Sequence, residues 1–234
     1  MTRTLTKRQK ASQGLVDPEK FYTLVEAAEL IKKGATAKFD ETVEMHLKLG
    51  INPKQNDQQV RGTTVLPHGV GKSKKVAVVA KGEKVKEAQA AGADYSGEAD
   101  LIEKIAKGWM DFDVLVATPD MMKDLTKLGK TLGPNGRMPN PKTGTVTFDL
   151  TRAIKEIKGG RIEFRADATS IVHAAIGKVS FDRQKLTENA QALIDAVLRA
   201  KPSTVKGVYL RSVTLCSTMG PGIAVRPNIA AEKE

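Results

Sequence analysis

The sequence lacks the features that mark several classes of protein. Its 234 residues include one cysteine, Cys216, so an internal disulfide framework is excluded and a reducing compartment is favoured. Aromatic residues make up only 4% of the chain, and no interleaved run of them could stack unpaired bases as some RNA-binding sheets do. No apolar run approaches the ~20 residues that span a bilayer, and the basic residues 1–10 have no apolar stretch behind them. We therefore expect a cytoplasmic protein without a membrane span or a secretory signal.

Positive charge, by contrast, is abundant. Lysine and arginine number 38 against 27 acidic residues, which gives a formal net charge of +11. This balance favours a polyanionic partner, either nucleic acid or an anionic membrane, without deciding between them. With 40% hydrophobic and 28% charged residues, the composition is that of a globular protein of one or two domains.

The first 68 residues show clear helix and strand signals. Thr23 and Glu26 form a capping-box pattern, which predicts a helix that ends near Gly34. Alternating apolar and polar residues predict a half-buried strand at 43–49, and a second extended run follows at 60–66. The buried face of the helix would carry Leu24, Val25, Ala28 and Ile31.

The same alternation of apolar and polar residues returns after residue 160. Ile162 and Phe164 would point to one face of a strand, and a long amphipathic helix would be capped by Asp182 and stop before Pro202. The last predicted strand, 207–217, changes phase along its length, which indicates a β-bulge.

Residues 69–159 have a different pattern. Continuous apolar runs at 76–80 and 114–117 are typical of strands buried on both faces of a parallel sheet. A loop rich in Gly and Pro is predicted at 129–144. Helices are predicted at 83–91, 100–107, 120–128 and about 150–158.

These patterns predict an α/β and α+β fold with two domains. Residues 1–68 and 160–234 would together form a discontinuous α+β domain, into which an α/β domain of residues 69–159 is inserted. Two sequential domains, or a single domain, stay open as alternatives. The two chain crossings would lie side by side as a hinge formed by Pro67, Gly69, Gly159 and Gly160.

A cofactor or catalytic site has little support. The triplets 71–73 and 129–131 read Gly-Lys-hydroxyl, but Leu66 and Asp124 stand where a Walker loop needs its first Gly. We therefore expect no enzyme, cofactor or metal, and keep as the alternative a nucleotide-binding protein or enzyme that uses the α/β insert. The candidate metal ligands, which show no metal-ligand spacing, are His46, His68, His173 and Cys216.

RNA binding is better supported, through three turn-rich stretches in the α+β domain. They are residues 36–42, 165–178 and 217–222, and they are rich in Thr, Ser, Gly or Lys. Because stacking aromatics are few, such stretches would read phosphates, 2′-hydroxyls and the shape of a folded RNA. Each stretch taken alone would more often be a plain connection, and it is their joint placement in this domain that favours RNA binding.

The stretches also resemble those of a known family. Thr36-Ala-Lys-Phe-Asp-Glu-Thr-Val43, Val60-Arg-Gly-Thr63 with Leu66-Pro-His-Gly69, and Ser217-Thr-Met-Gly220 closely resemble the bacterial large-subunit ribosomal protein L-one family. The most distinctive run is Leu132-Gly-Pro-Asn-Gly-Arg-Met-Pro-Asn-Pro-Lys142. The resemblance covers essentially the whole chain, in order and with similar spacing.

This resemblance implies a function. In that family the terminal domain binds a junction of large-subunit ribosomal RNA and forms a mobile stalk beside the exit site, whose movement assists release of deacylated tRNA. The family also represses translation by binding a leader of its own operon's messenger RNA. The inserted domain would be Rossmann-like without a cofactor. Expected partners are the ribosomal RNA, the leader mRNA, exit-site tRNA and other ribosomal components, with the chain a monomer in the cytoplasmic ribosome.

The resemblance also implies which residues contact RNA. Thr218 would bond a sugar or phosphate, Met219 would pack on a ribose, and Gly220 would permit a close approach. One departure weakens the stretch 165–178, because Arg165-Ala-Asp-Ala168 lacks an Asn and a Lys that relatives usually carry. The implied contacts are Lys38, Phe39, Glu41, Thr42, Arg165, His173, Lys178, Ser212, Thr218, Met219 and Gly220.

Overall fold

The structure is a computed structural model that describes residues 14–227. The described chain divides into two compact units, with junctions at Gly71/Lys72 and Arg161/Ile162. The first unit combines the segments before and after these junctions, and the second is Lys72–Arg161. The boundaries expected from sequence, 68/69 and 159/160, lie within three residues of these junctions.

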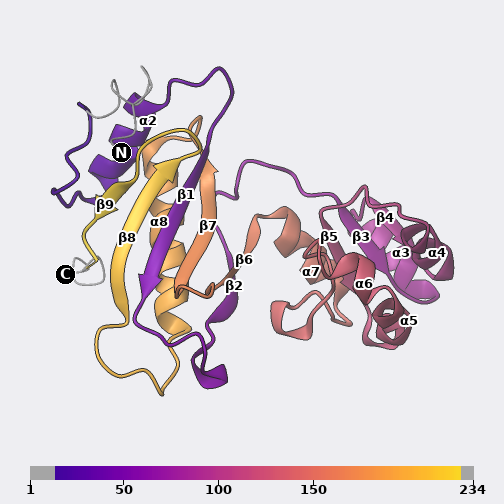
Figure 1. Ribbon diagram of the computed structural model, residues 1–234. Coiled ribbons are helices and arrows are strands. Elements are labelled where there is room, and N and C mark those ends of the chain that lie inside the picture. Colours follow the sequence, from indigo (N-terminus) through magenta and orange to yellow (C-terminus); the bar gives the residue numbers. More distant parts are fainter. Residues whose placement is uncertain (1–13, 228–234) are drawn as a thin grey trace. The chain divides into compact units, whose positions relative to one another are not determined.

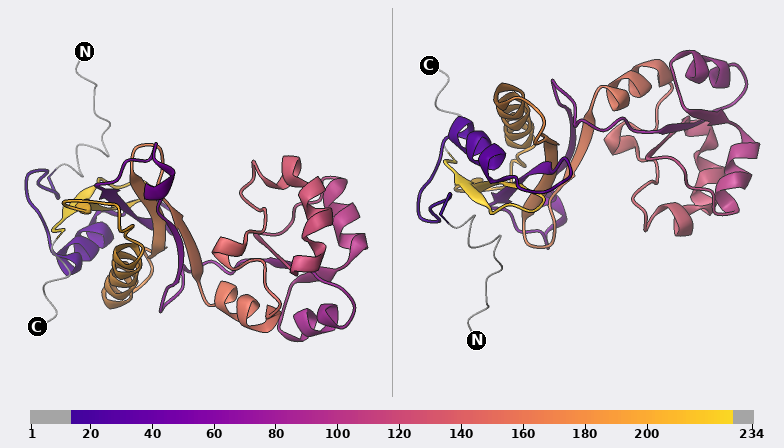
Figure 2. Two further views of the ribbon diagram at one scale, coloured as in Figure 1. Left: turned by 90° about the horizontal axis from the view of Figure 1, so that it is seen from below. Right: turned by 90° about the horizontal axis from the view of Figure 1, so that it is seen from above.

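The first unit is built on a four-stranded antiparallel sheet in the order β7-β1-β8-β9 (Figure 1). One face of the sheet is covered by two helices that both lie on the same side of it (Figure 2). Every second side chain of the central strand β1 is fully buried against them, as the alternation predicted. The elements are α2 (Leu24–Gly34), β1 (Thr42–Leu49), β7 (Ile171–Lys178), α8 (Arg183–Arg199), β8 (Leu210–Ser217) and β9 (Ile223–Val225).

Helix α2 begins as the sequence predicts. The Thr23 hydroxyl accepts from the Glu26 amide at 3.3 Å, and the Glu26 carboxylate accepts from the Thr23 amide at 2.9 Å. The predicted buried face was wrong at Val25, which is 44% exposed, while Ala27 is buried in its place. Asp182 occupies the N-cap position of helix α8 as predicted, but its side chain makes no capping hydrogen bond there.

The predicted phase shift of the last strand corresponds to a bulge. Lys48 pairs with Ser212 and Leu49 pairs with Leu210, so Arg211 is the extra residue on β8. Val208 lies before the strand and is 72% exposed, so the expectation that it belongs to the strand was wrong. The short strand β9 was not predicted.

A separate two-stranded sheet joins β2 (Arg61–Val65) to β6 (Arg161–Arg165), and a short 3-10 helix η1 (Asn56–Gln58) precedes it. Phe164 is buried, as predicted, and lies against Gly62, where a Cβ would approach the Phe164 ring to 2.7 Å. The segment 165–178 is a tight turn followed by the full strand β7, and Ser170 has a φ of 67° in that turn.

The second unit is a three-stranded parallel sheet in the order β4-β3-β5, with helices on both faces. One face packs on α4, α5 and α6, and the other on α3 and α7. Strand β4 was not predicted, and helix α6 and the 3-10 helix η3 lie inside the expected loop 129–144. The elements are β3 (Val76–Val79), α3 (Glu83–Ala90), β4 (Tyr95–Gly97), α4 (Ala99–Ala106), β5 (Val114–Ala117), η2 (Pro119–Met121), α5 (Met122–Lys127), α6 (Gly129–Leu132), η3 (Pro141–Thr143) and α7 (Leu150–Lys158).

The mixed α/β architecture therefore agrees with the fold class expected from sequence. Among residues 14–227, no helix has both the length and the apolar character needed to cross a bilayer.

Candidate nucleic-acid interface

The turn-rich stretches 36–42 and 217–222 and the end of the stretch 165–178 meet at one end of the four-stranded sheet. Strand β1 begins there at Thr42, and its antiparallel neighbours β8 and β7 end there at Ser217 and Lys178. The antiparallel register therefore gathers residues 36–42, 217–222 and the end of 165–178 into one cluster, which we call the strand-end cluster.

Thr42 lies at the centre of this cluster. Its amide donates to the Thr218 hydroxyl at 3.0 Å, and the Thr218 amide donates back to the Thr42 carbonyl at 3.0 Å. The Lys178 ammonium donates to the Thr42 hydroxyl at 2.8 Å. These bonds fix the two loops and the end of β7 in one arrangement.

Glu41 is buried within the strand-end cluster and bonds to both of its loops. It is 1% exposed, and its carboxylate accepts from the amides of Ala37 at 3.2 Å and Met219 at 3.0 Å. The implied RNA contact by the Glu41 side chain is therefore corrected, because a buried carboxylate that bonds two amides is not part of the surface. It ties the 36–42 loop to the 217–222 loop instead.

Exposed side chains surround this rigid centre. Phe39 is 56% exposed and Met219 is 53% exposed, although both are large and apolar. Lys38 and Thr218 are also exposed. Apolar side chains left on the surface beside a lysine can pack on riboses while the positive charge attracts phosphates.

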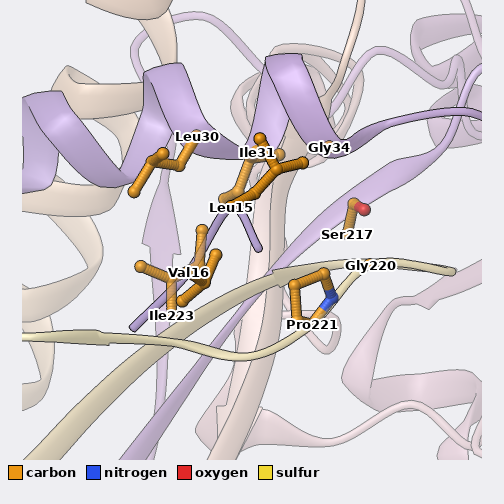
Figure 3. A pocket seen from close by; sticks show the side chains of 9 residues that line it. All are labelled: Leu15, Val16, Leu30, Ile31, Gly34, Ser217, Gly220, Pro221 and Ile223. Carbon is orange, nitrogen blue, oxygen red and sulfur yellow. The ribbon is translucent and has the colours of Figure 1, made fainter. Parts of the chain in front are cut away.

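The turn at Gly220 is closely packed on its inner side. A Cβ at Gly220 would lie 2.5 Å from the Ser217 hydroxyl, so a larger residue requires that hydroxyl to move. Figure 3 shows a small apolar pocket between this turn and helix α2, bounded by Ser217, Gly220 and Pro221 on one side and by Ile31 and Gly34 on the other.

Two other implied contacts lie on the face of the sheet that the helices leave open. His173 is exposed on β7, opposite His46 of β1, and Ser212 lies opposite Lys48 toward the other end of β8. These side chains share a face with Thr42 and Lys178 but are not part of the strand-end cluster. Arg165 belongs to β6 in the two-stranded sheet, where it is exposed.

The turn that carries the sequence departure is organised by Asp167. Its carboxylate accepts from the amides of Thr169 and Ile171, both at 2.8 Å. The Thr169 hydroxyl also donates to it, and these hydrogen bonds to the charged form lower the pKa of Asp167 to about 2. Asp167 therefore keeps the turn in shape although Ala166 and Ala168 flank it.

The open face also brings together residues that the sequence left unconnected. His46 Nδ1 is 2.8 Å from His173 Nδ1, and His46 Nε2 is 3.2 Å from Cys216 Sγ. No sequence spacing signals this group, because 127 and 170 positions separate the partners.

The predicted hinge residues flank the unit junctions. The segment of Pro67 and Gly69 is held to α8, since the His68 amide donates to Asn189 Oδ1 at 3.1 Å and Asn189 Nδ2 donates to the Gly69 carbonyl at 2.9 Å. Gly159 ends α7, and Gly160 has a φ of 99°, as Gly69 has 65°. Glycine suits both positive φ values, and the hinge itself stays a prediction.

One comparison with known protein families identifies the family of this chain. A family model described as "Ribosomal protein L1p/L10e family" matches residues 31–221, which include most of the chain and all three turn-rich stretches up to Pro221. The match supports a structural role at the ribosome, with ribosomal RNA as the associated molecule. The chain belongs to the ribosomal protein L1p/L10e family.

Proposed function

We propose that the chain binds a folded junction of large-subunit ribosomal RNA through the strand-end cluster and the open face of its four-stranded sheet. The observation that carries this proposal is the bonding of Thr42, Thr218 and Glu41, which holds two loops rigidly beneath exposed Phe39 and Met219. A surface fixed before binding loses little conformational entropy when it docks.

The chemistry of the surface suits a folded RNA better than an unpaired strand. Its exposed groups are small hydroxyls, backbone, lysines and two isolated apolar side chains, rather than a row of aromatic rings. Such groups contact sugars and phosphates at close range, which is how shape and 2′-hydroxyls are recognised.

The bound chain would form the mobile stalk near the tRNA exit site and assist release of deacylated tRNA. The same surface would bind the operon leader mRNA, so that the two RNAs compete and translation is repressed when ribosomal RNA is scarce. Movement of the stalk would use the junctions next to Gly69 and Gly160, whose positive φ values favour glycine.

The test is binding of the purified chain to the stalk-junction RNA fragment and to a plain duplex of equal length, across a salt series. Met219→Ala removes an exposed apolar group from the strand-end cluster, and Val208→Ala removes one from outside it as the matched control. We expect junction binding to survive added salt better than duplex binding. We also expect Met219→Ala, but not Val208→Ala, to weaken junction binding.

The proposal fails if both RNAs bind equally, if both lose affinity in salt, and if Met219→Ala changes neither affinity. Binding would then depend on the net charge alone, and this site assignment would be wrong. The other candidate, a nucleotide-binding protein or enzyme that uses the second unit, predicts a rise in melting temperature with ATP or NAD.

A further inference from the structure

The open face of the first unit carries a group of metal-ligating side chains that the RNA argument does not use. Glu44, His46 and Cys216 each offer one ligand atom, and these atoms all lie within 4.8 Å of one another. Glu44 and His46 alternate along β1, and Cys216 lies on β8 directly opposite Glu44. Two paired strands therefore hold all three on one face.

We propose that Glu44, His46 and Cys216 form a Zn²⁺ site. A thiolate, an imidazole and a carboxylate together are a ligand set that zinc prefers over magnesium or calcium. In a tetrahedral zinc site, a sulfur and a nitrogen ligand lie about 3.5 Å apart, as follows from ordinary bond lengths. His46 Nε2 and Cys216 Sγ are already 3.2 Å apart, so a small outward shift admits the ion.

A neighbouring histidine orients His46 for this role. His46 Nδ1 lies 2.8 Å from His173 Nδ1, so one of these two nitrogens carries a proton and the other accepts it. His173 Nε2 lies 3.5 Å from Asp167 Oδ2, which favours a proton on that nitrogen. In the neutral rings, His46 Nδ1 then donates to His173, and the lone pair of His46 Nε2 points toward Cys216. A second group that orients the ligating imidazole in this way is typical of metal sites.

Binding would deprotonate the Cys216 thiol, because the thiolate is the form of cysteine that ligates zinc. When Zn²⁺ binds, the S–H bond breaks, the sulfur–zinc bond forms and the proton passes to solvent, so binding strengthens as pH rises.

Three protein ligands leave one tetrahedral position for a water molecule on the open side of the sheet. This proposal concerns the free protein and does not rest on RNA binding. Failure of the zinc experiments would therefore leave the RNA proposal intact, and the reverse also holds.

The first experiment uses the chain without substitutions. Because Cys216 is the only cysteine, the rate of reaction with a maleimide reports on this thiol alone. After treatment with a chelator and its removal, we expect stoichiometric Zn²⁺ to slow the reaction at least ~10-fold, while Mg²⁺ leaves it unchanged. Equal rates with the two ions would overturn the proposal.

The second experiment measures Zn²⁺ affinity by competition with a chromophoric chelator. We expect one ion per chain, with affinity reduced at least ~10-fold in Cys216→Ser and Glu44→Gln and ~10–100-fold in His173→Gln, which loses the orienting group. His68→Gln is the matched control, because it removes a histidine that contacts Glu188 outside the site.

The variants also separate the proposed site from others. The proposal is overturned if Zn²⁺ binding is unchanged in both Cys216→Ser and Glu44→Gln. It is also overturned if binding is lost only in His68→Gln, because the ion would then lie elsewhere. Circular dichroism of each variant checks that its fold is unchanged.

Discussion

Thr42 and Thr218 bond each other in both directions across the end of the sheet. The Thr42 amide donates to the Thr218 hydroxyl, and both the amide and the hydroxyl of Thr218 donate to the Thr42 carbonyl, at 3.0 and 3.3 Å. The hydrogen bonds of Thr218 therefore have a structural role, because they link two loops that lie 176 positions apart in the sequence. Any contact that it makes with RNA uses the remaining lone pair of a hydroxyl that is already fixed.

Thr218→Ala is expected to lower the free energy of unfolding by about 1 kcal/mol, because the Thr42 amide loses its acceptor. The junction RNA affinity should fall as well, since the 217–222 loop is no longer held. Thr218→Ser keeps the hydroxyl and should restore both quantities. Urea unfolding and RNA titration of the two variants provide the measurement, and a serine variant as weak as the alanine variant would contradict this interpretation.

Glu41→Gln tests whether RNA binding depends more on the shape of the strand-end cluster or on the net charge of the chain. The substitution makes the chain more positive, which by itself would strengthen RNA binding. It also replaces one carboxylate oxygen, which accepts from the amide of either Ala37 or Met219, with an NH₂ group that cannot accept. We expect a loss of stability of about 1–3 kcal/mol and weaker junction binding at constant salt. Tighter binding would show that Glu41 does not hold the surface in shape.

Asn189→Ala should free the segment before the first junction. The Asn189 side chain is fully buried, accepts from His68 and donates to the carbonyls of Gly69 and Ile176. Each buried group left unbonded reduces stability by about 1–3 kcal/mol. Hydrogen exchange should show faster exchange of the His68 amide.

The matched control for Asn189 is Gln191→Ala on the same helix. That change removes only a half-exposed bond to Asp195, so the unfolding free energy should change by less than about 0.5 kcal/mol. Unchanged exchange of the His68 amide in Asn189→Ala would contradict the proposed anchoring.

We expect Asp167 to make the free energy of unfolding depend on pH in the acid range. Its pKa in the folded chain is about 2, below the ordinary value of 3.8, so its ionised form favours the folded state. That contribution is complete above pH ~4 and is lost as the pH falls toward ~2. Asp167→Asn keeps the amide-accepting oxygen and removes the charge, so its unfolding free energy should fall less steeply in this interval. Parallel curves for the two proteins would refute the assignment.

The larger elements of the fold were predictable because their burial is periodic. The alternation at 43–49 identified β1, and the continuous apolar runs at 76–80 and 114–117 identified parallel strands. The short strands β4 and β9 were missed, because three residues are too few to show a period.

The surface residues were harder to assign. The position of Glu41 in a turn-rich stretch does not reveal that its carboxylate is buried beneath Met219, a residue 178 positions away. The proximity of His46 and Cys216 likewise depends on strand order and register, which periodicity does not determine. Sequence patterns therefore singled out the stretches that form the strand-end cluster, whereas the contacts of their individual residues depend on the pairing of the strands.

The position of β1 has a consequence for synthesis of the chain. Its two neighbours in the sheet are β7, which ends at Lys178, and β8, which ends at Ser217. All three strands of the second unit are complete by Ala117. On the translating ribosome, the inserted sheet can therefore assemble while β1 has neither partner, and the strand-end cluster can form only after Ser217 and the loop that follows it have been made.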